Sequence, residues 1–369
     1  MIVALIYGAW SEPFYFGPHD GPVYYRLAGA SLEKGPFHCG LYEHSYWAPA
    51  WVEMTALLYR VFGHHPQVIQ VFLSLCLVWS AYISYRWSRS TLGHGVALAA
   101  AALSMSTIYL FQFTTFHQYE LLVGACLVTA AYLTISRDAY SSRRCVSALW
   151  RSGLAGLLTA IAVLSAAKMV LFAAAIALAM LIRSARKGGF GDFWAFVLTG
   201  GLVSAAWIAR NAYCFGEFIP LTTNGGVVYY MAHNPLSRMG GEFDPNVSVW
   251  PVMESLKISP HESSRWYALA NEYIARHPVE TARDAWIKLW LFFKPKHADQ
   301  VLVLTLCMIS VCLAALRRLR LSVDAVWWLA IPVGLAVVHS MYHLESRYLL
   351  PVWPFLAMFG AQALATRVK

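Results

Sequence analysis

The sequence predicts an all-α polytopic membrane protein with about ten transmembrane helices. Of its 369 residues, 59% are hydrophobic and only 13% are charged, whereas soluble proteins carry about 25% charged residues. Apolar segments long enough to cross a bilayer, which takes roughly 20 residues, recur along the chain. The basic residues gather in short clusters between these segments, as they do where charge sets membrane topology. The net charge of +9 is therefore attributed to topology and not to binding of nucleic acid.

Ten spans are expected in order. The first apolar run, residues 1–10, is too short to span a bilayer, and we interpret it as a truncated first helix. The nine further predicted spans are 66–86, 93–113, 118–136, 148–166, 168–183, 192–209, 299–316, 323–342 and 347–366.

The basic clusters give these spans an orientation. They follow the second, fourth, sixth, eighth and last spans, so all of them fall on one side if both termini are cytoplasmic. The loops 11–65 and 210–298 then lie outside an inner (plasma) membrane. We divide the chain into an N-terminal transmembrane module (1–209) with its first outer loop, an extracytoplasmic loop (210–298), and C-terminal transmembrane helices (299–369).

The first outer loop predicts two juxtamembrane helices. One follows Asp20 in an Asp-x-x-x-Tyr pattern that ends at Tyr24. The other has an apolar face of residues at helical spacing: Trp51, Met54, Leu58, Val61 and Phe62. Helices with one apolar face lie on membrane surfaces, so this pair is expected to cover a lipid-borne substrate.

The 210–298 loop has two unlike parts. In the first part, the segment 222–226 predicts a turn because it is rich in Thr, Asn and Gly. The second part predicts two amphipathic helices at the outer interface, where Trp and Tyr are favoured. Trp266 and Tyr273 share the face of the first, and Pro278 can open the second.

The cysteines suggest no metal site. Seven are scattered along the chain without a CxxC pair, and most are expected to be small apolar membrane residues. Cys39 and Cys214 are the two that fall in outer loops. A disulfide between them is left open, with unpaired thiols the leading expectation.

Polar groups that could carry chemistry gather at the outer ends of the spans. Ionisable residues at such positions are costly and often functional. Sugar transfer from a lipid phosphate needs a carboxylate to deprotonate the acceptor hydroxyl and cations to neutralise the phosphate. Asp20 is the candidate base, and the candidate phosphate ligands are Lys168, Arg210 and Arg347. Candidate substrate-binding residues are Tyr24, Tyr25, His117, Glu120, Asn224 and Tyr348.

Structural roles compete with each assignment. Asp20 can act as a helix N-cap, and Glu120 can favour the N-terminal dipole of its helix. Lys168 can extend to the interface without a ligand. Arg210 can bind lipid headgroups, and Arg347 with Tyr348 can anchor the chain at the interface.

The motifs together resemble a known superfamily. They are the Asp20-Gly-Pro-Val-Tyr-Tyr stretch, the run from Trp47-Ala-Pro49 to Gly63, the run from Arg210-Asn211 to Asn234-Pro235, and Glu345-Ser-Arg-Tyr-Leu-Leu-Pro351. Their order resembles the GT-C glycosyltransferases of the dolichyl-phosphate-mannose protein mannosyltransferase type, which include bacterial aminoarabinose transferases.

The resemblance implies an enzyme that uses a polyprenyl-phosphate sugar donor and acts from the extracytoplasmic side on a lipid, glycan or protein acceptor. By likeness, Asp20 has the role of the catalytic aspartate and Lys168 that of a phosphate-contacting lysine. Gly21 stands where the family often has a second acidic residue, so no metal ligand is assigned, and a divalent cation is left open. Two alternatives remain: a transporter or flippase of lipid-linked sugars, and a subunit with this fold that has lost catalysis.

Overall fold

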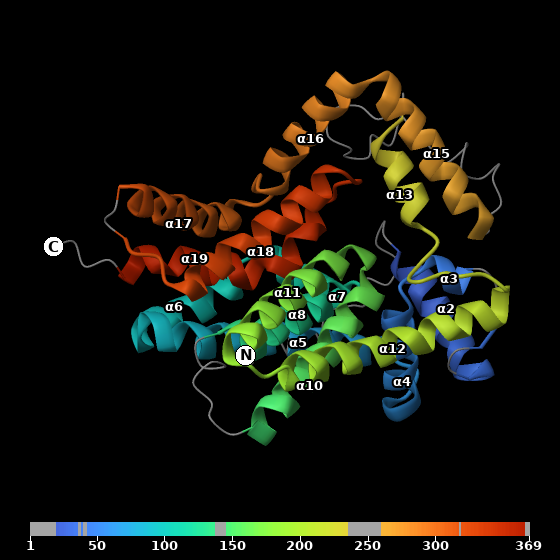
Figure 1. Ribbon diagram of the computed structural model, residues 1–369, viewed down its shortest axis with the longest axis horizontal. Coiled ribbons are helices and arrows are strands. Elements are labelled where there is room, and N and C mark those ends of the chain that lie inside the picture. Colours follow the sequence, from blue (N-terminus) through green and yellow to red (C-terminus); the bar gives the residue numbers. More distant parts are fainter. Residues whose placement is uncertain are drawn as a thin grey trace.

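The computed structural model describes residues 20–35, 38–39, 43–136, 145–234, 260–316 and 319–365, and every regular element in them is a helix (Figure 1). The predicted first helix, residues 1–10, lies outside the described residues. The elements up to residue 165 are α2 (Gly21–Lys34), α3 (Glu43–Tyr46), α4 (Pro49–Phe62), α5 (Pro66–Leu92), α6 (His94–Ser104), α7 (Ile108–Thr115), α8 (Glu120–Ile135) and α10 (Cys145–Ser165). The later elements are η1 (Ala167–Met169), α11 (Val170–Lys187), α12 (Gly191–Phe215), α13 (Gly225–Ala232), α15 (Pro260–Arg276), α16 (Pro278–Phe292), α17 (Ala298–Ala315), α18 (Val323–Ser340), η2 (Ser346–Val352) and α19 (Trp353–Ala365).

The spans form a bundle with α8 and α19 at its centre. Helix α8 packs against α5, α10 and η2, while α19 packs against α6, α17 and α18. Nearly every side chain of α8 and α19 is buried, whereas α12 presents large apolar side chains such as Leu202 to the outside. An apolar exterior of this kind suits a helix in contact with lipid.

Seven helical segments in the described part are long and apolar enough to span a membrane. They agree with the predicted spans except in two places. The predicted span 93–113 is broken: α6 and α7 meet at a bend of 52°, where the hydroxyl of Thr107 accepts a hydrogen bond from the backbone of Tyr109 and starts a new helix. The predicted span 118–136 is the shorter helix α8, which has 16 residues.

Helices occur in both predicted outer loops. Helix α2 has Pro22 in its first turn, and α4 begins at Pro49, because proline suits the first turn of a helix, where its missing N–H would be unpaired anyway. Helix α4 ends at Gly63, whose φ of +90° excludes most side chains. Their position on a membrane surface stays a prediction.

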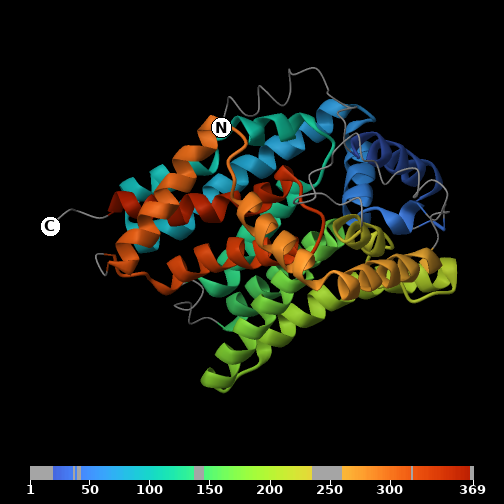
Figure 2. The same ribbon diagram turned by 90° about the horizontal axis from the view of Figure 1, so that it is seen from above.

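The outer elements gather at one end of the molecule. Figures 1 and 2 show α2, α3 and α4 together beside α13, while α13, α15 and α16 form an arch that rises from the bundle. Helix α13 was not predicted: the expected turn at 222–226 ends inside it, because the helix begins at Gly225. The rings of Tyr46, on α3, and Trp266, on α15, are buried in one cluster, which ties the arch to α3.

A close backbone approach places η2 against α8. A Cβ atom on Gly124 would lie 3.2 Å from the Cα atom of Pro351 and 3.3 Å from its carbonyl oxygen. Glycine therefore lets η2 lie directly on α8, since small residues allow helices to approach closely in membranes. This contact fixes the position of Arg347, which η2 carries.

Candidate active site

Arg347 is the centre of a charged cluster where η2 meets the segment before α8 and the start of α2. Its side chain is buried, at 6% exposure, yet it contacts three carboxylates. Its Nε lies 2.7 Å from Glu345 and 3.4 Å from Glu120, and its Nη2 donates to Asp20 at 3.1 Å. A buried charge is stable only where it is paired, so Arg347 holds these acids in place. We call Asp20, Glu120, Glu345 and Arg347 the acidic cluster.

Asp20 reaches the cluster from the start of α2. Although it precedes the helix, its side chain forms no cap hydrogen bond, so the N-cap alternative is wrong for this side chain. The carboxylate instead turns toward Arg347 and keeps 28% of its side-chain surface exposed. An acid held at one oxygen and open at its edge can accept a proton from a bound hydroxyl group.

Glu120 is the most deeply buried acid of the cluster, with a side chain that is 1% exposed. It is the first residue of α8, where a negative charge also favours the N-terminal end of the helix dipole. Gln118, just before the helix, accepts a hydrogen bond from Nη1 of Arg347. The segment before α8, which is distant from η2 in sequence, therefore also holds the guanidinium of Arg347.

Glu345 connects Arg347 to two further groups. The hydroxyl of Tyr348 donates to its Oε1 at 3.1 Å, and Nε2 of His343 lies 3.5 Å from the same oxygen. Burial by itself would raise the pKa of Glu345, but the hydrogen bond with His343 and the charge of Arg347 outweigh it, and the pKa is lowered. Glu345 is therefore ionised at neutral pH.

Lys168 lies beside the cluster on the short helix η1. Its Nζ is 3.0 Å from the ring centroid of Tyr348, a cation–π contact. The ring of Tyr348 also stacks on His339, with centroids 4.4 Å apart. No hydrogen bond or ion pair to Lys168 is found among the residues that the structure describes. Its ammonium group is thus held near the acids with its hydrogen-bonding capacity still available for a ligand.

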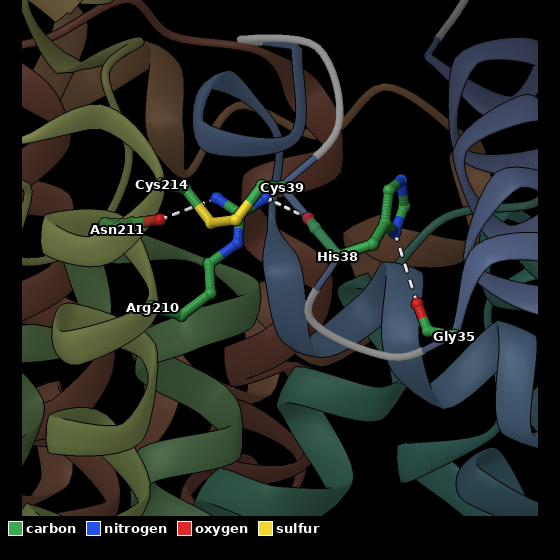
Figure 3. Close-up of a disulfide and its surroundings, with 6 residues drawn as sticks. All are labelled: Gly35, His38, Cys39, Arg210, Asn211 and Cys214. Atoms are coloured by element: carbon green, nitrogen blue, oxygen red, sulfur yellow. Dashed lines mark hydrogen bonds between the residues drawn. A yellow bond between two sulfur atoms is a disulfide. The ribbon is translucent and has the colours of Figure 1, made fainter.

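Arg210 lies elsewhere, next to a disulfide between Cys39 and Cys214 (Figure 3). Its guanidinium donates to the carbonyl oxygen of His38 at 2.6 Å and to the side chain of Asn211 at 2.8 Å. These contacts hold the loop after α2 against the end of α12. The structure does not join Arg210 to the acidic cluster by any contact between described residues, and its role as a phosphate ligand stays a prediction.

The disulfide itself differs from the leading expectation of unpaired thiols. It joins two residues that are 175 positions apart. Cys39 lies in the loop that follows α2, so the bond holds the first outer loop to α12.

Of the three tyrosines predicted to bind substrate, Tyr24 and Tyr25 pack against other aromatic rings. Tyr24 is 2% exposed and packs edge-on against Tyr119 and Trp47. Burial, with the nearby charge of Asp20 in addition, raises its pKa. Tyr25 stacks on His64 with centroids 4.8 Å apart. Tyr348 is the one that contacts the acidic cluster directly.

No contact between described residues joins His117 or Asn224 to the acidic cluster. His117 is 4% exposed, and its Nε2 lies 3.3 Å from the hydroxyl of Thr55. Burial lowers the pKa of His117 to about 3, with a contribution from His64. Asn224 precedes α13, and its side chain accepts a hydrogen bond from Thr222 at 2.7 Å. The substrate-binding roles of both stay predictions.

A pocket opens beside Glu345. It is lined by two lysines, by polar groups, and by apolar residues from α16, from η2 and from the segment before η2: Lys294, Lys296, Gln300, Ser346, Leu291, Phe292, Leu344 and Leu349. Sequence reasoning did not assign the two lysines or Gln118 to the site. The signal for the lysines was present in their position just before a predicted span, where cations meet lipid headgroups.

The acids do not form a metal centre. Asp20, Glu120 and Glu345 surround Arg347, and no group of three His, Cys, Asp or Glu side chains in the described part of the chain is placed to hold a metal ion.

Comparisons with known proteins show which fold this chain has. Residues 48–213 match the family model described as dolichyl-phosphate-mannose-protein mannosyltransferase. This segment runs from the start of α4 into α12 and includes Glu120 and Lys168, but neither Asp20 nor Arg347. No curated protein matches the sequence.

Solved structures are similar over nearly the whole chain. The crystal structure of ArnT from Cupriavidus metallidurans in the apo state matches with a TM-score of 0.57 and 14% identity, over 100% of this chain and 59% of that one. Two structures of the Archaeoglobus fulgidus oligosaccharyltransferase match at 16% identity over 98% of this chain and 48% of that one. Their TM-scores are 0.50 with a tethered acceptor peptide and 0.52 with Zn and sulfate.

The chain thus spans about half the length of the solved proteins that it matches. At these identities the likeness establishes the fold. The resemblance expected from the motifs is confirmed: the chain is a multi-pass helical membrane protein with the fold of the GT-C glycosyltransferases, the enzymes to which its family model and its structural neighbours belong.

Proposed function

We propose that this protein transfers a sugar from a polyprenyl-phosphate donor to the hydroxyl group of a lipid, glycan or protein acceptor. The observation that carries the proposal is the placement of one partly exposed carboxylate, Asp20, beside a buried arginine, with a lysine nearby for which the described residues provide no ion pair. Asp20 is the base and Lys168 a cation of the kinds that the reaction requires, while Arg347 holds Asp20 in place.

In the proposed reaction, the acceptor hydroxyl attacks the anomeric carbon of the donor sugar and gives its proton to Asp20. The bond between the anomeric carbon and the phosphate oxygen breaks, and its electron pair stays on the phosphate. Lys168 neutralises the charge that grows on that oxygen. Attack from the face opposite the phosphate inverts the configuration of the sugar.

Arg347 has a different part in this proposal from a simple phosphate ligand. Its guanidinium already contacts three carboxylates and Gln118, which leaves little capacity for another anion. We assign to it the positioning of Asp20. Lys294 and Lys296, at the pocket beside Glu345, supply further positive charge for the donor phosphate.

The disulfide supports an extracytoplasmic site. Disulfides persist in oxidising compartments and are rare in the cytosol. Cys39 follows α2, the helix that Asp20 precedes, and we propose that both residues face the extracytoplasmic side. This agrees with the orientation expected from the basic clusters, in which both termini are cytoplasmic.

The test is a transfer assay with the purified protein in lipid nanodiscs. A panel of polyprenyl-phosphate sugars, each labelled in the sugar, is offered with a membrane extract as the acceptor source. Donor consumption that requires both the extract and Asp20 is expected. Movement of intact donor across sealed vesicles without loss of the sugar would instead favour a flippase, and donor that is neither consumed nor moved would favour a subunit without catalysis.

A further inference from the structure

Three tyrosines from separate elements lie together, and one of them, Tyr342, precedes Glu345 of the acidic cluster by three residues. Tyr229 is on α13, Tyr267 on α15, and Tyr342 just after α18. The ring of Tyr229 lies 5.4 Å from that of Tyr267 and 5.3 Å from that of Tyr342, at interplanar angles of 41° and 57°. We call these residues the tyrosine cluster. All three are partly exposed, although aromatic side chains of this size are usually buried when they serve the core.

Other residues provide the core between these helices. Helices α13 and α15 join through the buried side chains of Val227 and Trp266, which form one hydrophobic cluster with Tyr46. Tyr230, the neighbour of Tyr229, packs on Trp266. The tyrosine cluster is therefore additional to the contact that holds the arch together.

The backbone makes room for this arrangement. A Cβ atom on Gly225 would lie 2.5 Å from the hydroxyl oxygen of Tyr267, which is far closer than a real contact. Only glycine at this position lets Tyr267 lie along the start of α13. The ring thus has a fixed place beside Tyr229.

The tyrosine cluster contains no acidic or basic side chain. Burial, with Tyr342 in addition, raises the pKa of Tyr267 to about 12. A further ring, that of His233, lies next to the tyrosine cluster, 4.8 Å from the ring of Tyr229. Burial lowers the pKa of His233. Its Nε2 lies 2.9 Å from the carbonyl oxygen of Met341, to which it donates. Neutral rings with hydroxyl edges suit a neutral ligand better than a phosphate or a charged peptide.

The chain leads directly from the tyrosine cluster to the acidic cluster. Tyr342 is followed by His343, whose Nε2 lies 3.5 Å from Glu345. Glu345 also contacts Tyr348, the residue against which Lys168 rests. Glu345 thus lies three residues after Tyr342 and three before Tyr348, on which Lys168 rests, so the chain places the tyrosine cluster next to the proposed site of transfer.

We propose that the tyrosine cluster binds a pyranose ring of the acceptor, so that the acceptor is a saccharide. The apolar C–H face of a pyranose covers an aromatic ring, while its hydroxyl groups find partners at the tyrosine hydroxyls, which combine an apolar body with a polar tip. Rigid tyrosines also provide contact area at low cost in conformational entropy. That the bound saccharide is the acceptor rests on the proposed function; the binding itself does not.

The first experiment measures binding without any reaction. Saturation-transfer NMR is recorded on the protein in nanodiscs with the methyl glycosides of glucose, galactose, mannose and N-acetylglucosamine. We expect saturation on the ring C–H protons of at least one glycoside, reduced about tenfold in Tyr229→Leu and Tyr342→Leu, which keep apolar bulk but remove the aromatic face. Tyr213→Leu, at a tyrosine on α12 that is 87% exposed, is the matched control and should keep the signal.

Equal saturation in all four proteins, no saturation of any glycoside by the wild type, or saturation of a neutral tripeptide alone would overturn the proposal. Gly225→Ala supplies a second variant, because its methyl group displaces the Tyr267 hydroxyl without removing a ring. It should weaken the signal while the melting temperature stays within a few degrees.

The second experiment uses the transfer assay, with the acceptor fraction that proves active. Tyr229→Leu and Tyr342→Leu should raise the acceptor KM about tenfold and leave the donor KM unchanged. A rise in the donor KM alone would show that the tyrosine cluster binds the sugar of the donor. It would overturn the assignment of the cluster to the acceptor. If the glycosides bind as expected but no donor is ever consumed, the proposed function fails and the binding site stands.

Discussion

The carboxylate of Asp20 lies 3.1 Å from the guanidinium of Arg347, although the two residues are 327 positions apart in the chain. The contact joins the first outer loop to the start of the last span. Asp20 is thereby held at the edge of a buried ion cluster, with its other side open. An acid that the fold has oriented costs no reorganisation when it accepts a proton, which is the advantage of a preorganised site.

Replacing the proposed base should stop the reaction and spare the fold. Asp20→Asn keeps the size of the side chain but cannot accept the proton, so the transfer rate should fall by about 10² to 10⁴. The melting temperature should change little, because Arg347 keeps contacts with Glu345 and Glu120. Glu33→Gln, at an exposed acid on the same helix, is the control. An Asp20→Asn enzyme with near-normal turnover would remove Asp20 from the chemistry.

Lys168 should affect the donor more than the acceptor. Hydrogen bonds to charged groups contribute about 1.5–3 kcal/mol, so Lys168→Ala should raise the donor KM about 10- to 100-fold. The measurement is initial rates at varied donor concentration, and the control is Lys34→Ala at an exposed lysine of α2. A donor KM that stays at the wild-type value would show that Lys168 rests on Tyr348 without binding the phosphate.

Arg347 should be the most costly residue of the cluster to remove. Arg347→Met leaves three carboxylates without their counter-ion, and breaking a buried pair costs about 3–5 kcal/mol. We expect a large fall in the free energy of unfolding, measured by chemical denaturation in detergent. Adding Glu120→Gln to Arg347→Met should restore part of the loss, because the buried Glu120 is then uncharged. Strictly additive effects of the two changes would argue against their interaction.

Stability should fall in mild acid because of His117. Its pKa is lowered from 6.5 to about 3 in the folded protein, so the unfolded chain binds a proton more readily between these values. The stabilisation from neutral His117 is complete above pH 6.5 and is lost as the pH falls toward 3, at up to about 1.4 kcal/mol per pH unit. His117→Asn should flatten this slope in melting curves, while His65→Asn, at an exposed histidine, should not. An unchanged slope in His117→Asn would assign the acid sensitivity to other groups.

The disulfide should stabilise the outer face. Cys39→Ser combined with Cys214→Ser should lower the free energy of unfolding by about 2–4 kcal/mol. A reducing agent should lower the melting temperature of the wild type and leave that of the double variant unchanged. Cys312→Ser, at an exposed free cysteine, is the control. If a reducing agent leaves the melting temperature of the wild type unchanged, the bond does not form in the membrane-embedded protein.

The sequence predicted the positions of most helices along the chain, but not where a helix bends or which other helix it packs against. Apolar length and helical periodicity are local properties, so the spans, the helix from Pro49 and the helix from Pro278 could be predicted from neighbouring residues alone. The bend between α6 and α7 could not, because the stretch 93–113 is predominantly apolar and its break depends on a few polar groups near Thr107. Helix α13 could not be predicted because Gly225 and Gly226 at its start indicate a turn, whereas in the structure they let the helix pack on α15.

The candidate site was predicted in part for a similar reason. The orientation of the spans placed Asp20, Glu120, Lys168 and Arg347 at one membrane face, and the structure brings these four together. It equally placed Arg210 there, but that side chain serves the loop of Cys39 and Cys214. Depth in the membrane follows from the sequence, whereas position around the bundle does not.

The sequence by itself determined that this is a helical membrane protein, because each span is defined by its own composition, and it predicted that the candidate site residues lie at one end of the spans. Only the tertiary structure decided which of those residues meet. Packing between helices that are distant in the chain, such as the approach of η2 to α8 at Gly124, sets which charges share a site. That packing depends on the shapes of many side chains at once, which no local pattern records.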